Sequence, residues 1–217
     1  MTKRVLFTLL VASFIGRVCA QDGFVPQTGT LTYDVFDRNG KAFVNPAPDV
    51  AGSPFFRDDW RLGSLVVNTN RRFDSVRLRL NLLSQEVHFL DRNNNEMALT
   101  KGYIKEMLLP ADPTGRFLLR FRNGFPPVDQ QDQYSFYQVL AEGKLSLILS
   151  RRKIIASQKD AMLEEVKKEY RTYEDYYIYD GKIMDRVRKD KAIIAGKELK
   201  FKSIDVLKKA IEDYNAS

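Results

Sequence analysis

The chain has 217 residues, of which 44% are hydrophobic and 29% are charged, a composition typical of a folded protein rather than a disordered one. Its formal net charge is +7, but acidic residues are mixed among the basic ones and no nucleic-acid-binding motif is present, which argues against a nucleic-acid partner. One histidine and one cysteine give little support to His/Cys metal sites, to disulfides, or to Ser-His-Asp and Cys-His catalysis.

Residues 1–20 have the three parts of a secretory signal peptide. Lys3 and Arg4 begin it, an apolar run ends at Gly16, and small residues precede an expected cut before Gln21. The apolar run is shorter than the ~20 residues that span a bilayer. We therefore expect an exported protein of the periplasm, the outer envelope or the extracellular space, with no transmembrane segment in the mature chain.

Cys19 raises the alternative of a lipoprotein, in which a cysteine carries the lipid. Arg17 lies where such a signal needs a small or apolar residue, so cleavage after Ala20 is favoured. The mature chain then has no cysteine, and we expect residues 21–217 to form a single domain stabilised by its core alone.

The first part of the mature chain predicts little regular structure. Residues 31–36 (LTYDVF) fit a short strand or a turn of helix, and three prolines make residues 41–56 an extended loop. Trp60 follows this loop and has two interpretations, a core anchor or a platform for a ligand.

Residues 63–109 are expected to form the centre of the fold as a run of β-strands. Between Asp74 and Leu82, aliphatic residues alternate with polar ones, which places them on opposite faces of a strand. Short connections between strands favour antiparallel neighbours and a meander. The expected strands are 64–68, 73–82, 86–91 and 96–100, and His88 is expected on the polar face of its strand.

The second half predicts further strands and one ambiguous segment. Strands are expected within 116–122, 134–141 and 144–152, and Asp180-Gly181 predicts a hairpin turn. In residues 157–173, apolar side chains fall at helical spacing among Glu and Lys, so this segment is either a charged amphipathic helix or a mobile excursion between strands.

The C-terminal segment, about 188–215, is expected to be helical. Residues 190–195 predict a short helix ending at Gly196, and Ser203 is a candidate N-cap for a helix over 204–214. The predicted fold class is therefore mainly β with minor α. It is an antiparallel meander of one or more sheets, an open barrel or a sandwich, with one or two short C-terminal helices.

Paired carboxylates are the remaining catalytic option. Asp58-Asp59 lies beside Trp60 and Glu174-Asp175 beside Tyr176, but neighbours in a strand point to opposite faces, whereas a glycosidase needs two carboxylates across one cleft. The segment from Asp91 resembles a calcium loop but lacks its glycine and its final glutamate, which favours a hairpin turn. We predict no catalytic residue, no metal site and no cofactor.

Tyrosines cluster near the second half of the chain. Exposed, they would form a contact surface for a protein or a glycan, and in a strand the alternate ones would be core. The candidate binding residues are Trp60, Tyr176 and Tyr177.

Two stretches resemble a known group of proteins. GSPFFRDDWRLGSL (residues 52–65) and VRLRLNLLSQEVHFLDRNNNEMAL (residues 76–99), with a C-terminal pattern of Leu207, Ile211, Tyr214 and Asn215, are similar to exported β-rich proteins of the Bacteroidota type. The resemblance implies residence in the cell envelope and transfers no activity.

The function expected from these features is that of a non-enzymatic binding or assembly module of the cell envelope that contacts a protein or a glycan. The alternative is a carboxylate-dependent glycoside hydrolase or another enzyme acting on polysaccharide. A carboxylate pair converging in a deep pocket would favour the enzyme, and an open strand edge or an exposed aromatic patch would favour the binding module.

Overall fold

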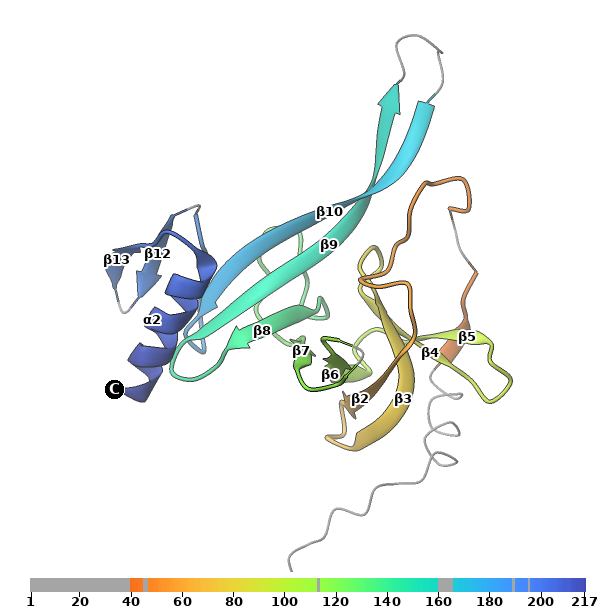
Figure 1. The fold of residues 1–217 in the computed structure, drawn as a ribbon, viewed down its shortest axis with the longest axis horizontal. Helices are drawn as coiled ribbons and strands as arrows, with labels where there is room; N and C mark the ends of the chain where they lie inside the picture. The colour runs from red at the N-terminus through yellow and green to blue at the C-terminus, as the bar shows by residue number, and fades with distance from the viewer. Residues whose placement is uncertain (1–39, 45–46, 113, 160–165, 189, 195) are drawn as a thin grey trace, which may run out of the picture.

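A computed structural model describes residues 40–44, 47–112, 114–159, 166–188, 190–194 and 196–217 (Figure 1). The predicted leader, Cys19 and the segment 31–36 lie outside the described residues. No helix of the described residues is long and apolar enough to cross a membrane.

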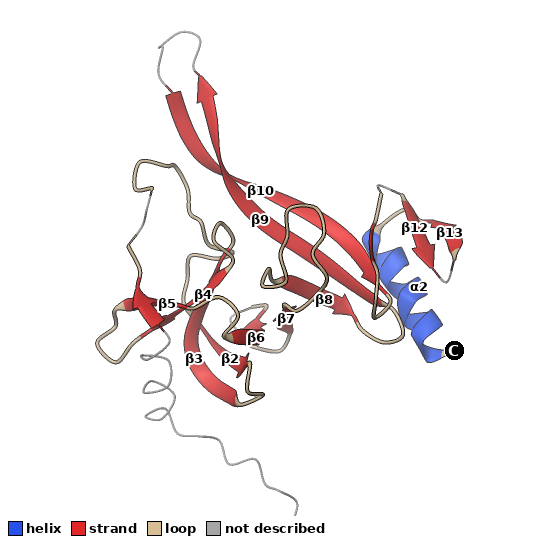
Figure 2. Ribbon diagram, turned by 180° about the vertical axis from the view of Figure 1, so that it is seen from behind, coloured by secondary structure: helices blue, strands red, loops and turns tan. Residues whose placement is uncertain are grey.

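The described chain is mainly β, as predicted, with one large antiparallel sheet, a two-stranded sheet and a C-terminal helix (Figures 1 and 2). The eleven-stranded sheet has the order β1-β5-β4-β3-β2-β6-β7-β8-β9-β10-β11, and β12 pairs with β13. The strands before the middle of the chain are β1 (Gly40–Ala42), β2 (Arg61–Val67), β3 (Arg72–Asn81), β4 (Glu86–Leu90), β5 (Glu96–Leu99), β6 (Ile104–Pro110) and β7 (Leu118–Arg122). The later elements are β8 (Tyr137–Ala141), β9 (Ser146–Lys159), β10 (Val166–Tyr179), β11 (Met184–Arg186), β12 (Lys191–Ile194), β13 (Lys197–Lys200) and α2 (Ile204–Ala216).

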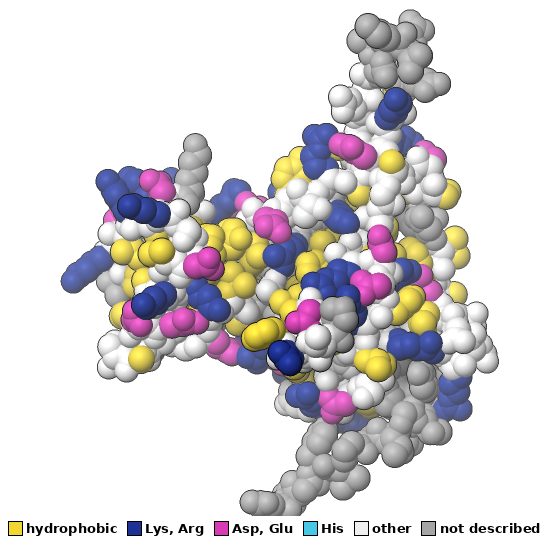
Figure 3. Space-filling model, viewed as in Figure 1, with side chains coloured by type: hydrophobic (Ala, Val, Ile, Leu, Met, Phe, Trp, Pro, Cys, Tyr) yellow, Lys and Arg dark blue, Asp and Glu magenta, His cyan; other side chains and the backbone are white. Residues whose placement is uncertain are grey.

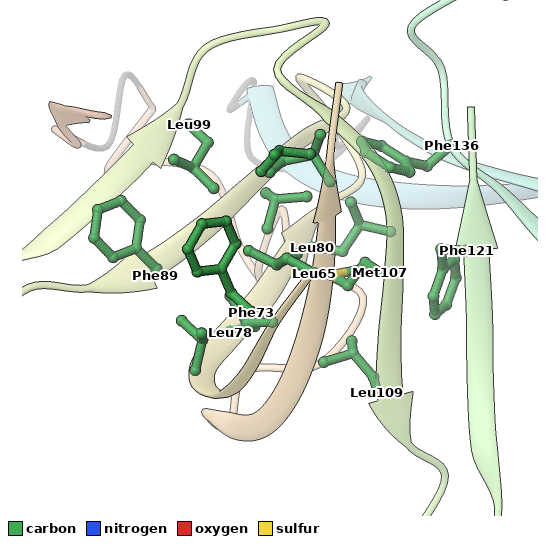
Figure 4. Close-up of a cluster of buried hydrophobic side chains, with 14 of the residues drawn as sticks. Leu65, Phe73, Leu78, Leu80, Phe89, Leu99, Met107, Leu109, Phe121 and Phe136 are labelled. Carbon is green, nitrogen blue, oxygen red and sulfur yellow. The ribbon is translucent and has the colours of Figure 1, made fainter. Parts of the chain in front are cut away.

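The meander predicted between residues 63 and 109 is confirmed for β2 to β5, whereas β6 crosses over and pairs with β2. The alternation of β3 buries its aliphatic side chains, because they face the concave side of the curved sheet. Figure 4 shows labelled side chains from β2 to β7 converging there. This first core cluster includes the fully buried Leu65, Leu78, Phe89 and Met107.

Strands β8 to β10 separate two further apolar clusters. On one face, Ile148 and Tyr177 pack under the loop that carries Phe125. On the other face, Leu147 and Ile178 pack against the helix and the two-stranded sheet. The second half of the large sheet is therefore covered on both sides, whereas its first half folds around a core of its own.

The predicted C-terminal helix is confirmed. The Ser203 side chain caps it by accepting a hydrogen bond from the Val206 N–H, and Leu207 and Ile211 are buried on its inner face. The Asn215 side chain accepts from the Leu145 N–H and donates to the Leu145 carbonyl, each at 2.8 Å. These two bonds fix the helix to the turn between β8 and β9.

Two helical predictions are wrong. Residues 190–195 were expected to form a helix, but Lys191–Ile194 is strand β12, and Gly196, with a φ of 76°, makes the hairpin turn to β13. In the ambiguous segment 157–173, the described residues belong to strands β9 and β10, so neither a helix nor a mobile excursion is correct for them. The helical spacing of apolar residues in 157–173 is misleading, because a two-stranded ribbon with both faces exposed to solvent need not alternate polar and apolar residues.

The β9–β10 hairpin is the longest feature of the fold. Its strands pair over fourteen residues each, from Ser146↔Tyr179 to Lys159↔Val166. We call residues 153–159 and 166–172 the arm. The arm extends beyond the rest of the molecule in Figures 1 and 2, and most of its side chains are exposed.

The root of the arm is fastened to the first half of the sheet. The Lys153 N–H donates to the Leu82 carbonyl at 2.9 Å, and the Lys153 ammonium donates to the carbonyls of Ser53 and Phe55 at 2.8 and 2.6 Å. The buried Gln85 amide donates to the carbonyls of Leu82 and Arg151. These bonds fix where β9 leaves the body.

We expect the first core cluster to carry most of the fold's stability. Leu80→Ala removes a side chain that is 1% exposed and leaves a cavity, so it should lower the free energy of unfolding by about 2–5 kcal/mol in urea denaturation. The matched control, Leu118→Ala, truncates a leucine that is 56% exposed on β7 and should change stability by less than about 1 kcal/mol. Equal effects at the two leucines would contradict this assignment of the core.

Candidate binding surface

The polar face of β3 to β5 lies beneath the loop that precedes β2. His88 is on that face, as expected, but it is fully buried there, with the rings of Phe43 and Phe55 against it at centroid distances of 4.6 and 5.0 Å. Its Nδ1 lies 2.6 Å from a carboxylate oxygen of Glu96, and Arg79 binds both oxygens of the same carboxylate. The three side chains form a structural cluster under an aromatic cover, although the buried Nε2 of His88 has no hydrogen-bond partner among the described residues.

Trp60 belongs to the same cover. It is half-buried, and the Arg79 guanidinium lies over its ring at 4.4 Å and over the Phe55 ring at 3.6 Å. The structure therefore places Trp60 beside Phe55, where the loop before β2 packs on Arg79, and leaves Trp60 half-exposed.

Tyr176 and Tyr177 do not form one surface, because they point to opposite faces of β10. Tyr177 is 1% exposed and donates a hydrogen bond to Asp129 at 2.6 Å, so the expectation of a surface role is wrong for this residue. Burial and the neighbouring Asp129 raise the pKa of the Tyr177 hydroxyl. Tyr176 is half-buried on the face that carries α2, and burial raises its pKa as well.

The carboxylate pairs are held apart as the alternation of a strand requires. Glu174 pairs with Arg151 at 2.6 Å, whereas Asp175 pairs with Arg186. Asp59 is exposed and pairs with Arg61. Within the described ranges, no group of three or more His, Cys, Asp or Glu side chains is placed to hold a metal ion.

The segment from Asp91 is a hairpin turn between β4 and β5, as predicted. The Asp91 carboxylate accepts hydrogen bonds from the backbone N–H groups of Asn93 and Asn95, at 2.8 and 2.7 Å, and Asn94 has a φ of 63°. These bonds lower the pKa of Asp91, the Asn95 side-chain bond most.

The arm presents an open strand edge. The Lys153 N–H points away from β10 towards Leu82, so the backbone groups of Ile155, Ser157 and Lys159 point the same way by alternation. None of these three residues has a strand partner on that side among the described residues. A free edge of this length is a template for another strand.

The opposite edge of the arm is braced. Ala51 forms a parallel bridge to Glu169, donating to the Lys168 carbonyl at 2.9 Å and accepting from the Tyr170 N–H at 3.1 Å. The Lys168 ammonium adds an ion pair to Asp49 at 2.8 Å. Beyond Lys153, the described residues of the arm are therefore held to the body from the β10 side, which leaves the outer edge of β9 available.

Two hollows lie along the β9–β10 hairpin. One, of about 340 Å³, lies where the arm leaves the body and is lined by Phe43, Asn81 and Tyr170, with Glu86 as its carboxylate. The other, of about 410 Å³, opens between β11 and β12 at the far end of β10. We call it the β11–β12 cleft. Figure 3 shows hydrophobic side chains between charged ones in the region of β12 and β13.

Comparisons with family models, with curated proteins and with solved structures find no match to this chain. The candidate surface is therefore defined by its own geometry.

Sequence reasoning missed both the arm edge and the cleft. The segment KAIIAGKELK (191–200) has a strand–glycine–strand pattern that could have revealed β12 and β13. The open edge had no signal of its own, because pairing depends on which strands lie next to β9 in space.

The cluster of His88, Glu96 and Arg79 predicts an acid-sensitive contribution to stability. Burial alone would raise the pKa of Glu96, but hydrogen bonds from His88 and Arg79 outweigh it and hold that pKa below its ordinary 4.5. Because the folded pKa is the lower one, Glu96 stabilises the fold above the unfolded value, and this contribution is lost as the pH falls through the folded value.

Glu96→Gln should therefore lower stability at neutral pH and flatten the loss of stability between about pH 5 and about pH 3, measured by urea denaturation at several pH values. The control, Glu198→Gln, removes a carboxylate on the surface that pairs with Lys191 at 3.1 Å, and should leave the pH dependence nearly unchanged. An unchanged pH dependence in Glu96→Gln would refute the role assigned to Glu96.

Proposed function

We propose that this chain is an exported, non-enzymatic binding or assembly module of the cell envelope, which contacts a partner protein through the arm. The observation that carries the proposal is the unpaired β9 edge beyond Lys153. A partner strand added there would gain main-chain hydrogen bonds, and pockets for alternate side chains would give specificity. The signal-like leader supports export.

The side chains of the arm suit a protein partner. Ile155 and Val166 are exposed, at 38% and 58%, beside the basic Lys159 and Lys167. Apolar contact area together with charge is the composition expected of a docking ribbon. Figure 3 shows the outer part of the arm standing clear of the body.

The alternative, a carboxylate-dependent glycoside hydrolase, has less support. The hollow beside the arm is lined by one carboxylate, Glu86, which forms an ion pair with Lys41 at 3.4 Å. The β11–β12 cleft contains Asp185 and Glu198, but Glu198 is paired with Lys191. Among the described residues that line the two hollows, there is no pair of carboxylates free of ion pairs that could face each other across a bound sugar.

Photo-crosslinking in the source cells tests the proposal. A photoreactive side chain at Ser157, on the open edge, should give adducts with a defined envelope protein. The same group at Phe117, which is 68% exposed away from the arm, is the matched control and should not give these adducts. Identical adducts at both positions, or none at Ser157, would reject the arm as the docking element. Release of sugars from envelope polysaccharide by the purified protein would favour the enzyme instead.

Export has a separate test. We expect the protein recovered from cells to begin at Gln21, because the apolar run and the small residues before it define the cut. N-terminal sequencing of the protein from fractionated cells measures this. Recovery of the full chain in the cytoplasm, or of a chain that begins with a lipid-modified Cys19, would contradict the expected processing.

A further inference from the structure

The β11–β12 cleft is a strand pair that opens after one bridge. Arg188 and Lys191 exchange two backbone hydrogen bonds, of 3.1 and 2.7 Å, as neighbours in an antiparallel hairpin do. Two residues further along each strand, Arg186 and Ile193 would be the next pair, but no bridge joins them within the described part of the chain. The space between them is the cleft.

The backbone groups on both sides of this opening point into it. The Val187 N–H donates to the Tyr176 carbonyl, so by alternation the N–H and C=O of Arg186 point away from β10 and towards the cleft. Lys191 pairs with Arg188, and by the same alternation Ile193 presents its backbone away from β13. The cleft is therefore bordered by two strand edges able to bind an extended peptide.

The side chains of the cleft select the chemistry of its occupant. Its floor is apolar and is formed by Ile178, Val187 and Ala192, which belong to the second core cluster or pack against it. Its rim carries Arg186, Arg188 and Lys191, against the carboxylates Asp185 and Glu198.

Within this rim, Arg188 is the cation that lacks a carboxylate. Arg186 is paired with Asp175, and Lys191 with Glu198. Arg188 is exposed and has no ion pair with the described residues. An extended segment that carries both apolar and acidic residues would match the floor and this free guanidinium.

The chain contains one such segment at the end of its own arm. Residues 160–165 read Asp-Ala-Met-Leu-Glu-Glu, three acidic residues around three apolar ones. We call them the arm tip by their place in the sequence between β9 and β10. The tip cannot reach the cleft of its own molecule, because Val166 and Ile178 are separated along the extended β10 by about 40 Å.

We propose that the β11–β12 cleft of one copy binds the arm tip of a second copy as an extended segment. Acidic side chains of the tip would pair with Arg188, and its apolar side chains would pack against the half-buried Val187 and the exposed Ile193 that line the cleft. This inference rests on the proposed function of the arm as a docking element. Because the donating and accepting surfaces differ, the contact is heterologous and generates chains or closed rings rather than a two-fold dimer.

Complementary charge reversals test this contact in the full chain without its leader. The cleft variant is Arg188→Glu, and the tip variant is Glu164→Lys with Glu165→Lys. We expect the mass of the wild-type protein, measured by sedimentation over about 1 to 100 µM, to increase with concentration. Each variant alone should associate at least about tenfold more weakly than the wild type.

Mixing the two variants gives a sharper outcome. The unchanged acidic tip of the cleft variant matches the unchanged cleft of the tip variant, and the reversed tip of the tip variant matches the reversed cleft of the cleft variant. The mixture should therefore associate as the wild type does, although neither variant does so alone. Combining both reversals in one chain should restore self-association. Arg116→Glu, an exposed charge reversal of the same kind away from both surfaces, is the control and should behave as the wild type.

The failure of this inference can be told from the failure of the proposed function. A wild-type protein that is monomeric throughout the concentration range, or charge variants that associate as the wild type does, would overturn the cleft–tip contact. Arm-specific crosslinks to a different protein would then still support the arm as a docking element. If neither self-association nor arm-specific crosslinks are observed, both the cleft–tip contact and the docking role of the arm are rejected.

Discussion

The attachment of β9 to the end of β3 is the constraint on which the rest of the structure depends. Gln85 is buried, and its amide joins Leu82, Arg151 and Phe136, three segments that are remote in sequence. The Arg151 carbonyl and the Phe136 N–H each gain a partner in this way, and a buried backbone group left without a partner costs about 1–3 kcal/mol. The junction therefore fixes where the arm leaves the body and how the two halves of the sheet meet.

The junction at Lys153 also divides strand β9 into a part that packs in the core and a part that extends into the arm. Between Leu147 and Ser150, strand β9 is paired on both sides and its side chains are buried. Beyond Lys153, the described residues of the same strand pair with β10 and have no strand partner on their outer edge. A single strand thus belongs to the core at one end and carries the proposed docking edge at the other.

The candidate surface was only partly predictable. The adjacency of Asp180 and Gly181 identified the turn into β11, but no local pattern predicted that β11 and β12 separate after the bridge between Arg188 and Lys191. The expectation for Tyr177 failed because one residue of register decides whether a side chain faces the core or the surface. His88 was expected on a polar face, and a loop with no regular structure of its own buried it.

The amino-acid sequence by itself determined the β-strands of the central meander and the C-terminal helix. Their signals are local: alternation in β3, the Asn-rich turn after Asp91, and the Ser203 cap. Only the tertiary structure decided the pairing of β9 with β10 over fourteen residues, the braced and free edges of the arm, and the cleft beyond β11. Those features depend on which strands become neighbours, and hydrogen bonds between segments remote in sequence carry no local pattern.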